Sequence, residues 1–239
     1  MTSTAPVRIP GPGVPTGVRL QSLFESEPDL GVVHLDADDR IEAANAAARR
    51  IYLHEGRADE ALEGQALRSL YPAPFAGEVD RFRGLLARED RPLLIRGIWR
   101  GHGVYTSVHP APGGGCVLLG RRGAVSGPEV APSRHVRVDA EVLELGELSV
   151  LTPRELEVLA LLGSGGTLKD AAADLRRSVK TVESHRDNIA RKLGLSRRGE
   201  LVRVVERSGL RPADVGRSRL ILDRAGPRPG SLGASSQIR

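Results

Sequence analysis

A run of seventeen residues, 176–192, concentrates side chains that can bind an acidic polymer. Basic side chains can neutralise phosphates, and carboxylates and hydroxyls can form hydrogen bonds with base edges. The side chains concerned are Arg176, Arg177, Lys180, Thr181, Glu183, Ser184, His185, Arg186, Asp187, Arg191 and Lys192. This run is therefore the candidate nucleic-acid-binding site.

A helix is needed to present these side chains on one surface, and the sequence predicts one. The hydroxyl of Ser178 can cap its start, and Gly194 can end it, because a glycine adopts positive φ without a steric clash. The buried stripe is expected to consist of Val182, Ile189 and Leu193. A period of 3.6 residues then turns outward Lys180, Glu183, Ser184, Asp187 and Arg191. On the flanks, where phosphates would lie, are Thr181, His185, Arg186 and Lys192.

Three further short helices are predicted around this one. Thr152 and Glu155 form a capping box that starts the first, and a glycine-rich run ends it. Thr167, followed by Asp170, starts the second, which is barely two turns long. Ser196 is the predicted cap of the last helix. The apolar residues of that last helix are Leu201, Val204 and Val205.

The second and third of these four helices are joined by a tight turn and predict a helix-turn-helix. In that motif the second helix is held so that its outer face can enter the major groove of DNA. The alternative is a charged, solvated face on a small helix bundle. Because capping, turn length and periodicity all agree, the helix-turn-helix is favoured.

Residues 151–210 resemble the LuxR-type DNA-binding domain of bacterial transcription regulators. The resemblance rests on LTPRELEVL, SVKTVESHRDNIARKLG and the closing LVRV. It implies an all-α domain of four helices, here placed at 147–211. Its third helix would read the major groove and its fourth would pair two copies, so that a dimer meets a twofold-related site.

The chain departs from that family at two places. The family has glycine and then an aliphatic residue in the turn, where this chain has Arg176 and Arg177. A left-handed backbone at Arg176 would cost about 1 kcal/mol or more, although both arginines are also placed to contact phosphates. Ala171 replaces a larger aliphatic residue, which predicts a thinner core.

Charge is distributed unevenly along the 239 residues. Residues 1–150 carry a net charge of −3, residues 151–210 carry +4, and the remainder carries +4. This asymmetry is what a nucleic-acid-binding segment requires. Cys116 is the only cysteine, so no intrachain disulfide can form. No window approaches the roughly 18 apolar residues of a membrane helix, and we expect a cytoplasmic protein.

The amino-terminal half predicts an α+β fold with a mostly antiparallel sheet. Residues 31–36 and a strand starting at Arg40 form a hairpin, and Asn45 leads into a helix. A longer helix is expected over about 78–88. Three strands close the pattern, and they begin at Pro92, Gly103 and Cys116.

This order resembles a PAS domain over residues 19–122. The resemblance rests on GVVHLDADDRIEAANAAARRI and EGQALRSLYP. It implies a sensory or dimerising module with a pocket between sheet and helices. By spacing alone, the pocket candidates are Asn45, Phe82, Ile98 and Tyr105, and plain core packing is the favoured alternative for each.

The remaining segments are rich in Pro, Gly, Ser or Arg. Residues 1–18 and the basic tail 212–239 are expected to be disordered, and residues 123–146 to form a linker. Within that linker, Val136, Val138 and Val142 suggest a strand, whereas Val142, Leu143 and Leu145 suit a short helix.

No catalytic or metal-binding constellation emerges, and no cofactor is expected. Asp36, Asp38 and Asp39 could suggest the magnesium pocket of a phosphoacceptor receiver domain. That domain also needs a lysine near its end, and no lysine precedes Lys169. The glycines at 113–115 are not followed by the Gly-Lys-Ser/Thr of a phosphate-binding loop.

The favoured hypothesis is a homodimeric transcription regulator that binds double-stranded DNA, with RNA polymerase and an unknown small-molecule signal as further partners. One alternative is a ligand-binding signalling protein whose basic helices dock a protein partner. Another is a sigma-factor-like initiation protein, which 3% aromatic residues and a strand-rich first half disfavour. An enzyme is the weakest alternative.

Because the first half lacks the receiver lysine, acetyl phosphate is expected neither to label the protein nor to change its affinity for DNA. Freshly purified protein is also expected to show no visible absorbance bands. Mass spectrometry after incubation with acetyl phosphate checks the first point. An aspartyl phosphate on Asp36, Asp38 or Asp39 would contradict the prediction.

Overall fold

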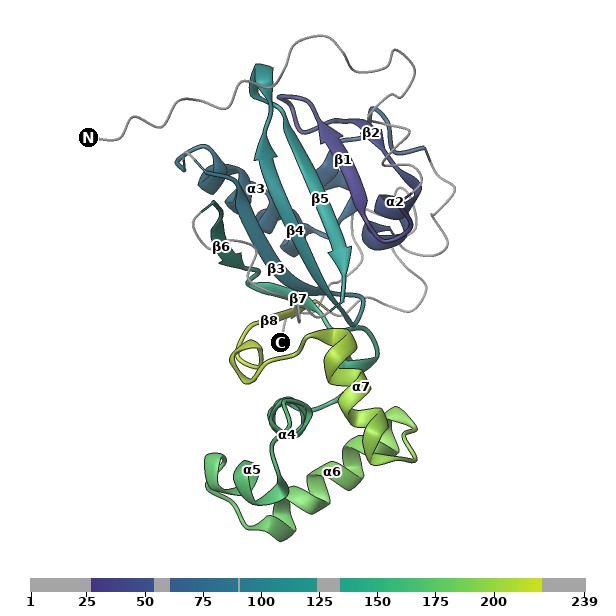
Figure 1. The fold of residues 1–239 in the computed structure, drawn as a ribbon, viewed down its shortest axis with the longest axis vertical. Coiled ribbons are helices and arrows are strands. Elements are labelled where there is room, and N and C mark those ends of the chain that lie inside the picture. Colours follow the sequence, from purple (N-terminus) through teal and green to yellow (C-terminus); the bar gives the residue numbers. More distant parts are fainter. Residues whose placement is uncertain (1–26, 54–60, 90, 124–133, 221–239) are drawn as a thin grey trace, which may run out of the picture.

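The computed structural model describes residues 27–53, 61–89, 91–123 and 134–220. Two parts follow one another along the chain, a sheet domain built from β1 to β6 and a helical domain that runs from η4 to α7 (Figure 1). The expected mixed α/β half followed by a helical domain is therefore confirmed. In the described part of the chain no helix has both the length and the apolar character needed to cross a membrane.

The sheet domain has six strands in the order β2-β1-β5-β4-β3-β6. Neighbours pair antiparallel except β3 and β6, which are parallel. The strands are β1 (Gly31–Leu35), β2 (Ile41–Ala44), β3 (Leu93–Trp99), β4 (His102–Pro110), β5 (Cys116–Arg122) and β6 (Val136–Asp139). Its helical elements are α2 (Ala46–Tyr52), η2 (Leu67–Leu70), α3 (Ala73–Leu86) and η3 (Pro112–Gly114).

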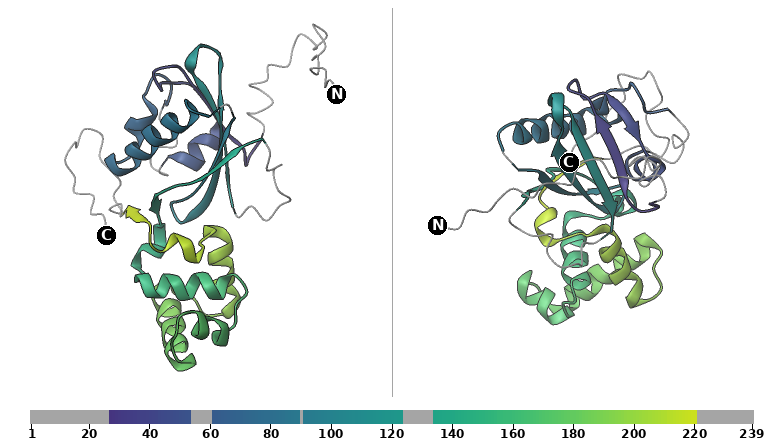
Figure 2. Two further views of the ribbon diagram at one scale, coloured as in Figure 1. Left: turned by 90° about the vertical axis from the view of Figure 1, so that its left-hand side faces the viewer. Right: turned by 45° about the horizontal axis from the view of Figure 1, so that its top comes forward.

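Helices α2 and α3 lie on one face of this sheet, as the edge-on view shows (Figure 2). Asn45 begins α2 and ties it to the sheet: its Oδ1 accepts from the backbone N–H of Ala48 at 2.8 Å and of Val32 at 3.0 Å. Helix α3 begins at Ala73 rather than near residue 78, because Pro72 and Pro74 suit a helix start. The core between helices and sheet is aliphatic and includes Leu35 and Leu93.

The helical domain contains the four expected helices, which follow a short 3-10 turn. They are η4 (Gly146–Val150), α4 (Pro153–Gly163), α5 (Leu168–Asp174), α6 (Val179–Leu193) and α7 (Arg198–Ser208). The capping boxes at Thr152 and Thr167 and the cap at Ser178 are confirmed. The cap at Ser196 is wrong: α7 begins after Arg197, and the Glu200 carboxylate accepts from the backbone N–H groups of Ser196 and Arg197.

Two segments expected to lack structure are partly ordered. The expected linker contains β6, which joins the sheet, and β7 (Val142–Glu144), so the strand interpretation is the correct one there. The expected disordered tail contains η5 (Pro212–Asp214) and β8 (Ser218–Leu220), which pairs in parallel with β7. Both corrections have one cause: Leu143 and Leu220 are buried, and burial of apolar side chains offsets the cost of ordering the chain. The expectations for residues 1–18, 124–133 and 221–239 lie outside the described residues.

The turn between α5 and α6 is strained at one residue. Arg176 has φ 48°, in the left-handed region, directly after the end of α5. The backbone N–H of Arg177 donates to the carbonyl of Ala172 at 2.9 Å, which is the bond pattern of a Schellman cap. Glycine is usual at the left-handed position because it has no Cβ to clash.

Arg176→Gly is therefore expected to raise the free energy of unfolding by about 1 kcal/mol, because it removes the Cβ strain. Thermal melting of the full chain measures this as a higher midpoint. Arg177→Gly is the matched control, since Arg177 is absent from the positive-φ residues and the added backbone freedom should lower the midpoint. An unchanged or lower midpoint for Arg176→Gly would contradict the prediction.

Candidate nucleic-acid interface and cavity

Helix α6 lies at the end of the helical domain away from the sheet domain (Figure 1). Val182 and Ile189, on its inner side, are fully buried against the other helices. The opposite side carries the exposed side chains of Lys180, Ser184 and Asp187. Apart from Lys192, the structure thus brings the residues of the candidate site together on and beside one helix.

Spacing along a helix would allow Glu183 to pair with Arg186 and Asp187 to pair with Arg191, but the observed pairs are different. Arg186 bonds the neighbouring Asp187 at 2.8 Å rather than Glu183, whose carboxylate lies 3.9 Å from Lys180. Arg191 donates to the side-chain oxygen of Asn188 at 3.2 Å rather than to Asp187. Within the part of the chain that the structure describes, Glu183 is held only by this long, exposed ion pair, so its carboxylate can turn toward a ligand at little cost.

A polar hollow borders α6 on one side. Its walls come from the start of α4, the turn and the first half of α6, and consist of Pro153, Arg154, Glu157, Arg177, Thr181 and His185. Arg154 is fixed there by bonds to Glu157 at 2.6 Å and to the carbonyl of Leu175 at 2.8 Å. Arg154 is not among the residues that the sequence predicts for this site. Its signal in the sequence is its place in the first turn of a helix that the capping box of Thr152 and Glu155 starts.

Lys192 does not belong to this surface. Its ammonium donates to the buried carboxylate of Glu155 at 2.7 Å and to the carbonyl of Val150 at 3.4 Å. Burial alone would raise the pKa of Glu155, but the bonds from Lys192 and Thr152 outweigh it and hold that pKa below its usual range. Lys192 therefore fastens α6 to the start of α4.

The sheet domain holds an apolar cavity of about 100 Å³ between the sheet and its helices. Phe82 and Ile98 line it, as expected for pocket residues. Asn45 and Tyr105 do not: Asn45 caps α2, and Tyr105 accepts a 3.4 Å bond from Arg211. Side chains alternate across a strand, and the residues before and after Tyr105, Val104 and Thr106, line the cavity instead.

The wall of the cavity includes three packed aromatic rings and one pair of hydrogen-bonded hydroxyls. Trp99 contacts Tyr71 and Phe75 with ring centroids 5.1 and 4.8 Å apart. The hydroxyls of Tyr52 and Thr106 lie 2.9 Å apart, and burial raises the pKa of Tyr52 to about 12. The walls are therefore uncharged near neutral pH except at Arg83, which pairs with Asp39 at 2.9 Å.

The aspartates of the first hairpin stabilise its turn and its contact with α3. Asp36 accepts from the backbone N–H groups of Asp38 and Arg40, each at 2.8 Å, and Asp39 pairs with Arg83.

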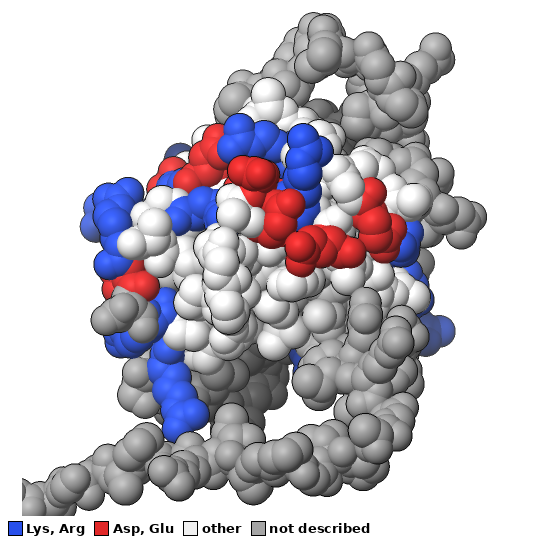
Figure 3. Space-filling model, turned by 90° about the horizontal axis from the view of Figure 1, so that it is seen from above, with Lys and Arg blue, Asp and Glu red and all other residues white. Residues whose placement is uncertain are grey.

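The view onto the far end of the sheet domain shows acidic and basic side chains interspersed along one side of a broad uncharged surface (Figure 3). Among the described residues no group of three His, Cys, Asp or Glu side chains is arranged to hold a metal ion.

Residues 149–205 match the family model described as bacterial regulatory proteins, luxR family. The transcriptional regulatory protein TdiR of Thauera aromatica is 39% identical over 84 residues, which cover 35% of this chain and 34% of TdiR. The oxygen regulatory protein NreC of Staphylococcus aureus is 49% identical over 53 residues, 22% of this chain and 24% of NreC. The chain thus spans only about a quarter to a third of these relatives, and the likeness identifies a carboxy-terminal helix-turn-helix domain of luxR type.

Two solved structures are similar over more of the chain. The Vibrio cholera VqmA-Ligand-DNA complex aligns with 85% of this chain and 94% of its own, at 21% identity and a TM-score of 0.46. Escherichia coli SdiA aligns with 80% and 86%, at 16% identity and a TM-score of 0.23. Both TM-scores are too low to establish a shared fold.

Lys192→Met is expected to lower the free energy of unfolding by about 1–2 kcal/mol, because it leaves the buried Glu155 carboxylate with fewer donors. Since the pKa of Glu155 is lowered in the folded state, this contribution is present above the unfolded pKa and is lost as the pH falls through the folded value. The difference from wild type should therefore shrink below about pH 4. Urea unfolding at several pH values measures it. Arg191→Met is the control, and an equal effect in both variants would contradict the assignment.

Proposed function

We propose that this protein is a homodimeric, cytoplasmic transcription regulator whose helical domain binds double-stranded DNA with α6 in the major groove. The observation that carries the proposal is the capped helix α6, which buries Val182 and Ile189 and leaves a polar face free at the end of the molecule. A recognition helix needs this division between a fixed inner side and an accessible outer side.

The side chains around that face suit two different tasks. Arg177, His185 and Arg154 border the polar hollow beside α6 and are placed to contact phosphates. Glu183 and Ser184 lie on the outer side of α6, where they can form hydrogen bonds with bases, and a carboxylate can accept from the amino group of cytosine. Lys192 is left out of the interface because Glu155 holds it.

We propose that the sheet domain is a PAS-like module that senses a small molecule or pairs two copies of the chain. Its support is the strand order together with an apolar cavity that has one hydroxyl pair and one charged wall residue, Arg83. Such cavities bind apolar molecules that carry few polar groups. RNA polymerase is a further partner of the proposed regulator.

The alternative function, of a different class, is signalling: the basic helices would bind an acidic protein partner instead of DNA. A salt titration of binding to DNA separates the two, because phosphate contacts release counterions and give a steep dependence of affinity on salt. A flat dependence would favour the protein partner.

Glu183→Ala is expected to cost roughly 1–3 kcal/mol of binding on the preferred DNA site and to relax base choice there. Arg186→Ala should instead weaken binding to all sequences alike and lower the salt slope by about one. Glu42→Ala, which removes an exposed acid from β2 of the sheet domain, is the control. Selection from randomised DNA by all four proteins decides between the roles. An unchanged preferred site with Glu183→Ala would remove Glu183 from base reading.

A further inference from the structure

The segment that enters the helical domain forms part of the cavity wall. Ala140 and Val142 line the cavity, together with residues of the sheet domain such as Val104. Both lie between the end of β6 and the first helical turn, η4. We call residues 140–145 the connector. A molecule that fills the cavity therefore contacts the connector.

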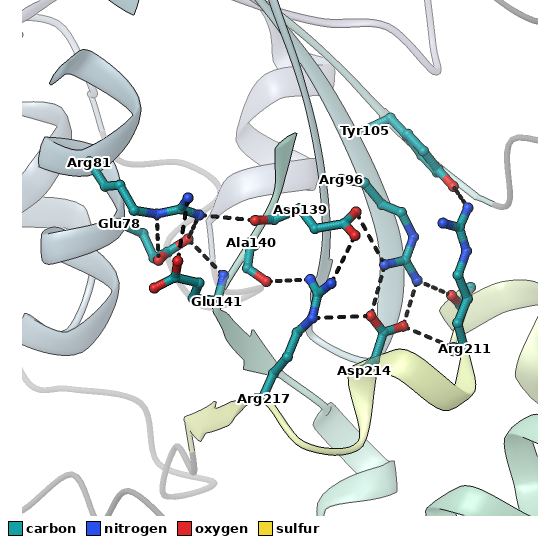
Figure 4. Close-up of polar contacts among 11 residues, drawn as sticks. Glu78, Arg81, Arg96, Tyr105, Asp139, Ala140, Glu141, Arg211, Asp214 and Arg217 are labelled. Atoms are coloured by element: carbon teal, nitrogen blue, oxygen red, sulfur yellow. Dashed lines mark hydrogen bonds and ion pairs between the residues drawn. The ribbon is translucent and has the colours of Figure 1, made fainter. Parts of the chain in front are cut away.

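The connector is also bonded to the segment that leaves the helical domain (Figure 4). Arg217 donates to the carbonyl of Ala140 at 2.6 Å and to the carboxylate of Asp139 at 2.8 Å. Strand β7 pairs in parallel with β8, so that Val142 lies opposite Ser218. The chain therefore enters and leaves the helical domain beside one wall of the cavity.

A buried ion pair fixes the carboxy-terminal segment to the sheet. Arg96, on β3, bonds both carboxylate oxygens of Asp214, on η5, at 2.9 and 2.6 Å. The side chain of Arg96 is 6% exposed and that of Asp214 is 0% exposed, so separating them would leave two buried charges uncompensated. The backbone carbonyl of Arg96 also accepts from the N–H of Ala140 at 2.7 Å. Strand β3 thus holds both η5 and the start of the connector.

Strand β7 is the strand of the cavity wall with the fewest partners. The wall strands β1, β3, β4 and β5 each have a neighbour on both sides in the six-stranded sheet, whereas β7 pairs with β8 alone among the described strands. A two-stranded pairing is only marginally stable by itself. The cavity of about 100 Å³ is smaller than the roughly 150 Å³ that hold one benzene molecule in a protein core. A molecule of that size must displace part of the wall, and β7 is the wall strand that can move.

A displacement of β7 reaches α6 through packed side chains. Leu143 and Leu145 are buried in the core that the connector shares with the four helices. Leu145 directly precedes η4, and at the end of η4 the carbonyl of Val150 accepts from the ammonium of Lys192, on α6, at 3.4 Å. Because close-packed side chains leave few voids to absorb a shift, a displacement at Val142 moves η4 against α6.

We infer that a molecule bound in the cavity controls the position of α6 through Val142 and η4. The inference rests on the function proposed above, and it makes Val142 a positioning residue, because Val142 acts on α6 only through η4. In a dimer that pairs through α7, the position of α6 relative to α7 determines whether both recognition helices fit the DNA. Binding in the cavity and binding to DNA are then coupled, and each changes the affinity of the other by the same factor.

The test uses the full chain, benzene as the probe for the cavity, and the DNA site that wild type selects. The rise in thermal midpoint measures binding of benzene, and DNA affinity is measured with and without saturating benzene. Wild type is expected to change its DNA affinity at least about 5-fold. In Val142→Ala, which opens space on the side of the connector, benzene should still bind and change DNA affinity less than about 2-fold. Val138→Ala makes the same change on β6, outside the cavity wall, and should keep the wild-type response.

Hydrogen exchange gives a second readout that needs no DNA. Benzene should change the exchange of the η4 amides in wild type and in Val138→Ala but not in Val142→Ala. A loss of stability alone would raise exchange in both valine variants with or without benzene, so it cannot produce this pattern.

The outcomes separate this inference from the function on which it rests. Benzene that binds wild type without changing DNA affinity or η4 exchange would overturn the inference, and so would a Val142→Ala protein that responds like wild type. Failure of benzene to bind would overturn it as well. If η4 exchange responds as expected but wild type binds no DNA, the proposed function fails and the coupling from the cavity to η4 stands. If Val142→Ala does not fold, the exchange response of wild type decides.

Discussion

The burial of Arg96 against Asp214 is the interaction on which the arrangement of the two domains depends. Taking two charges out of water costs several kcal/mol each, and the cost is offset only where the geometry is good and the remaining donors and acceptors are bonded. Burial on its own lowers the pKa of Arg96, but bonding to Asp214 and the charge of Asp139 outweigh it and raise that pKa. The guanidinium therefore stays charged, and the carboxy-terminal segment must stay beside β3.

The helical domain could be predicted from sequence because its signals are local. Thr152, Thr167 and Ser178 each cap a helix within three residues of their own position, and Gly194 ends α6 with φ 67°. Val182 and Ile189 are two helical turns apart among polar residues, and this spacing determines which side of α6 is buried. None of these features needs information from distant parts of the chain.

The remaining features could not be predicted because they depend on partners far away in sequence. The burial of Asp214 depends on Arg96, more than a hundred residues earlier, which bonds its carboxylate. The spacing of Lys192 on α6 predicts a phosphate contact, because it carries no information about Glu155, 37 residues before it. Spacing alone makes Tyr105 a cavity candidate, because the sequence predicts its strand but not which of the two faces of that strand the helices cover.

The position of Trp99 has a practical consequence. It is the single tryptophan in the chain, it lines the cavity, and its indole N–H donates to the carbonyl of Tyr52 at 3.2 Å. Indole emission depends on the polarity and packing around the ring. All tryptophan fluorescence of this protein therefore originates at the cavity wall, three residues along β3 from Arg96. The molecule thus carries an intrinsic optical reporter, which needs no added label, at the end of the strand that also carries Arg96.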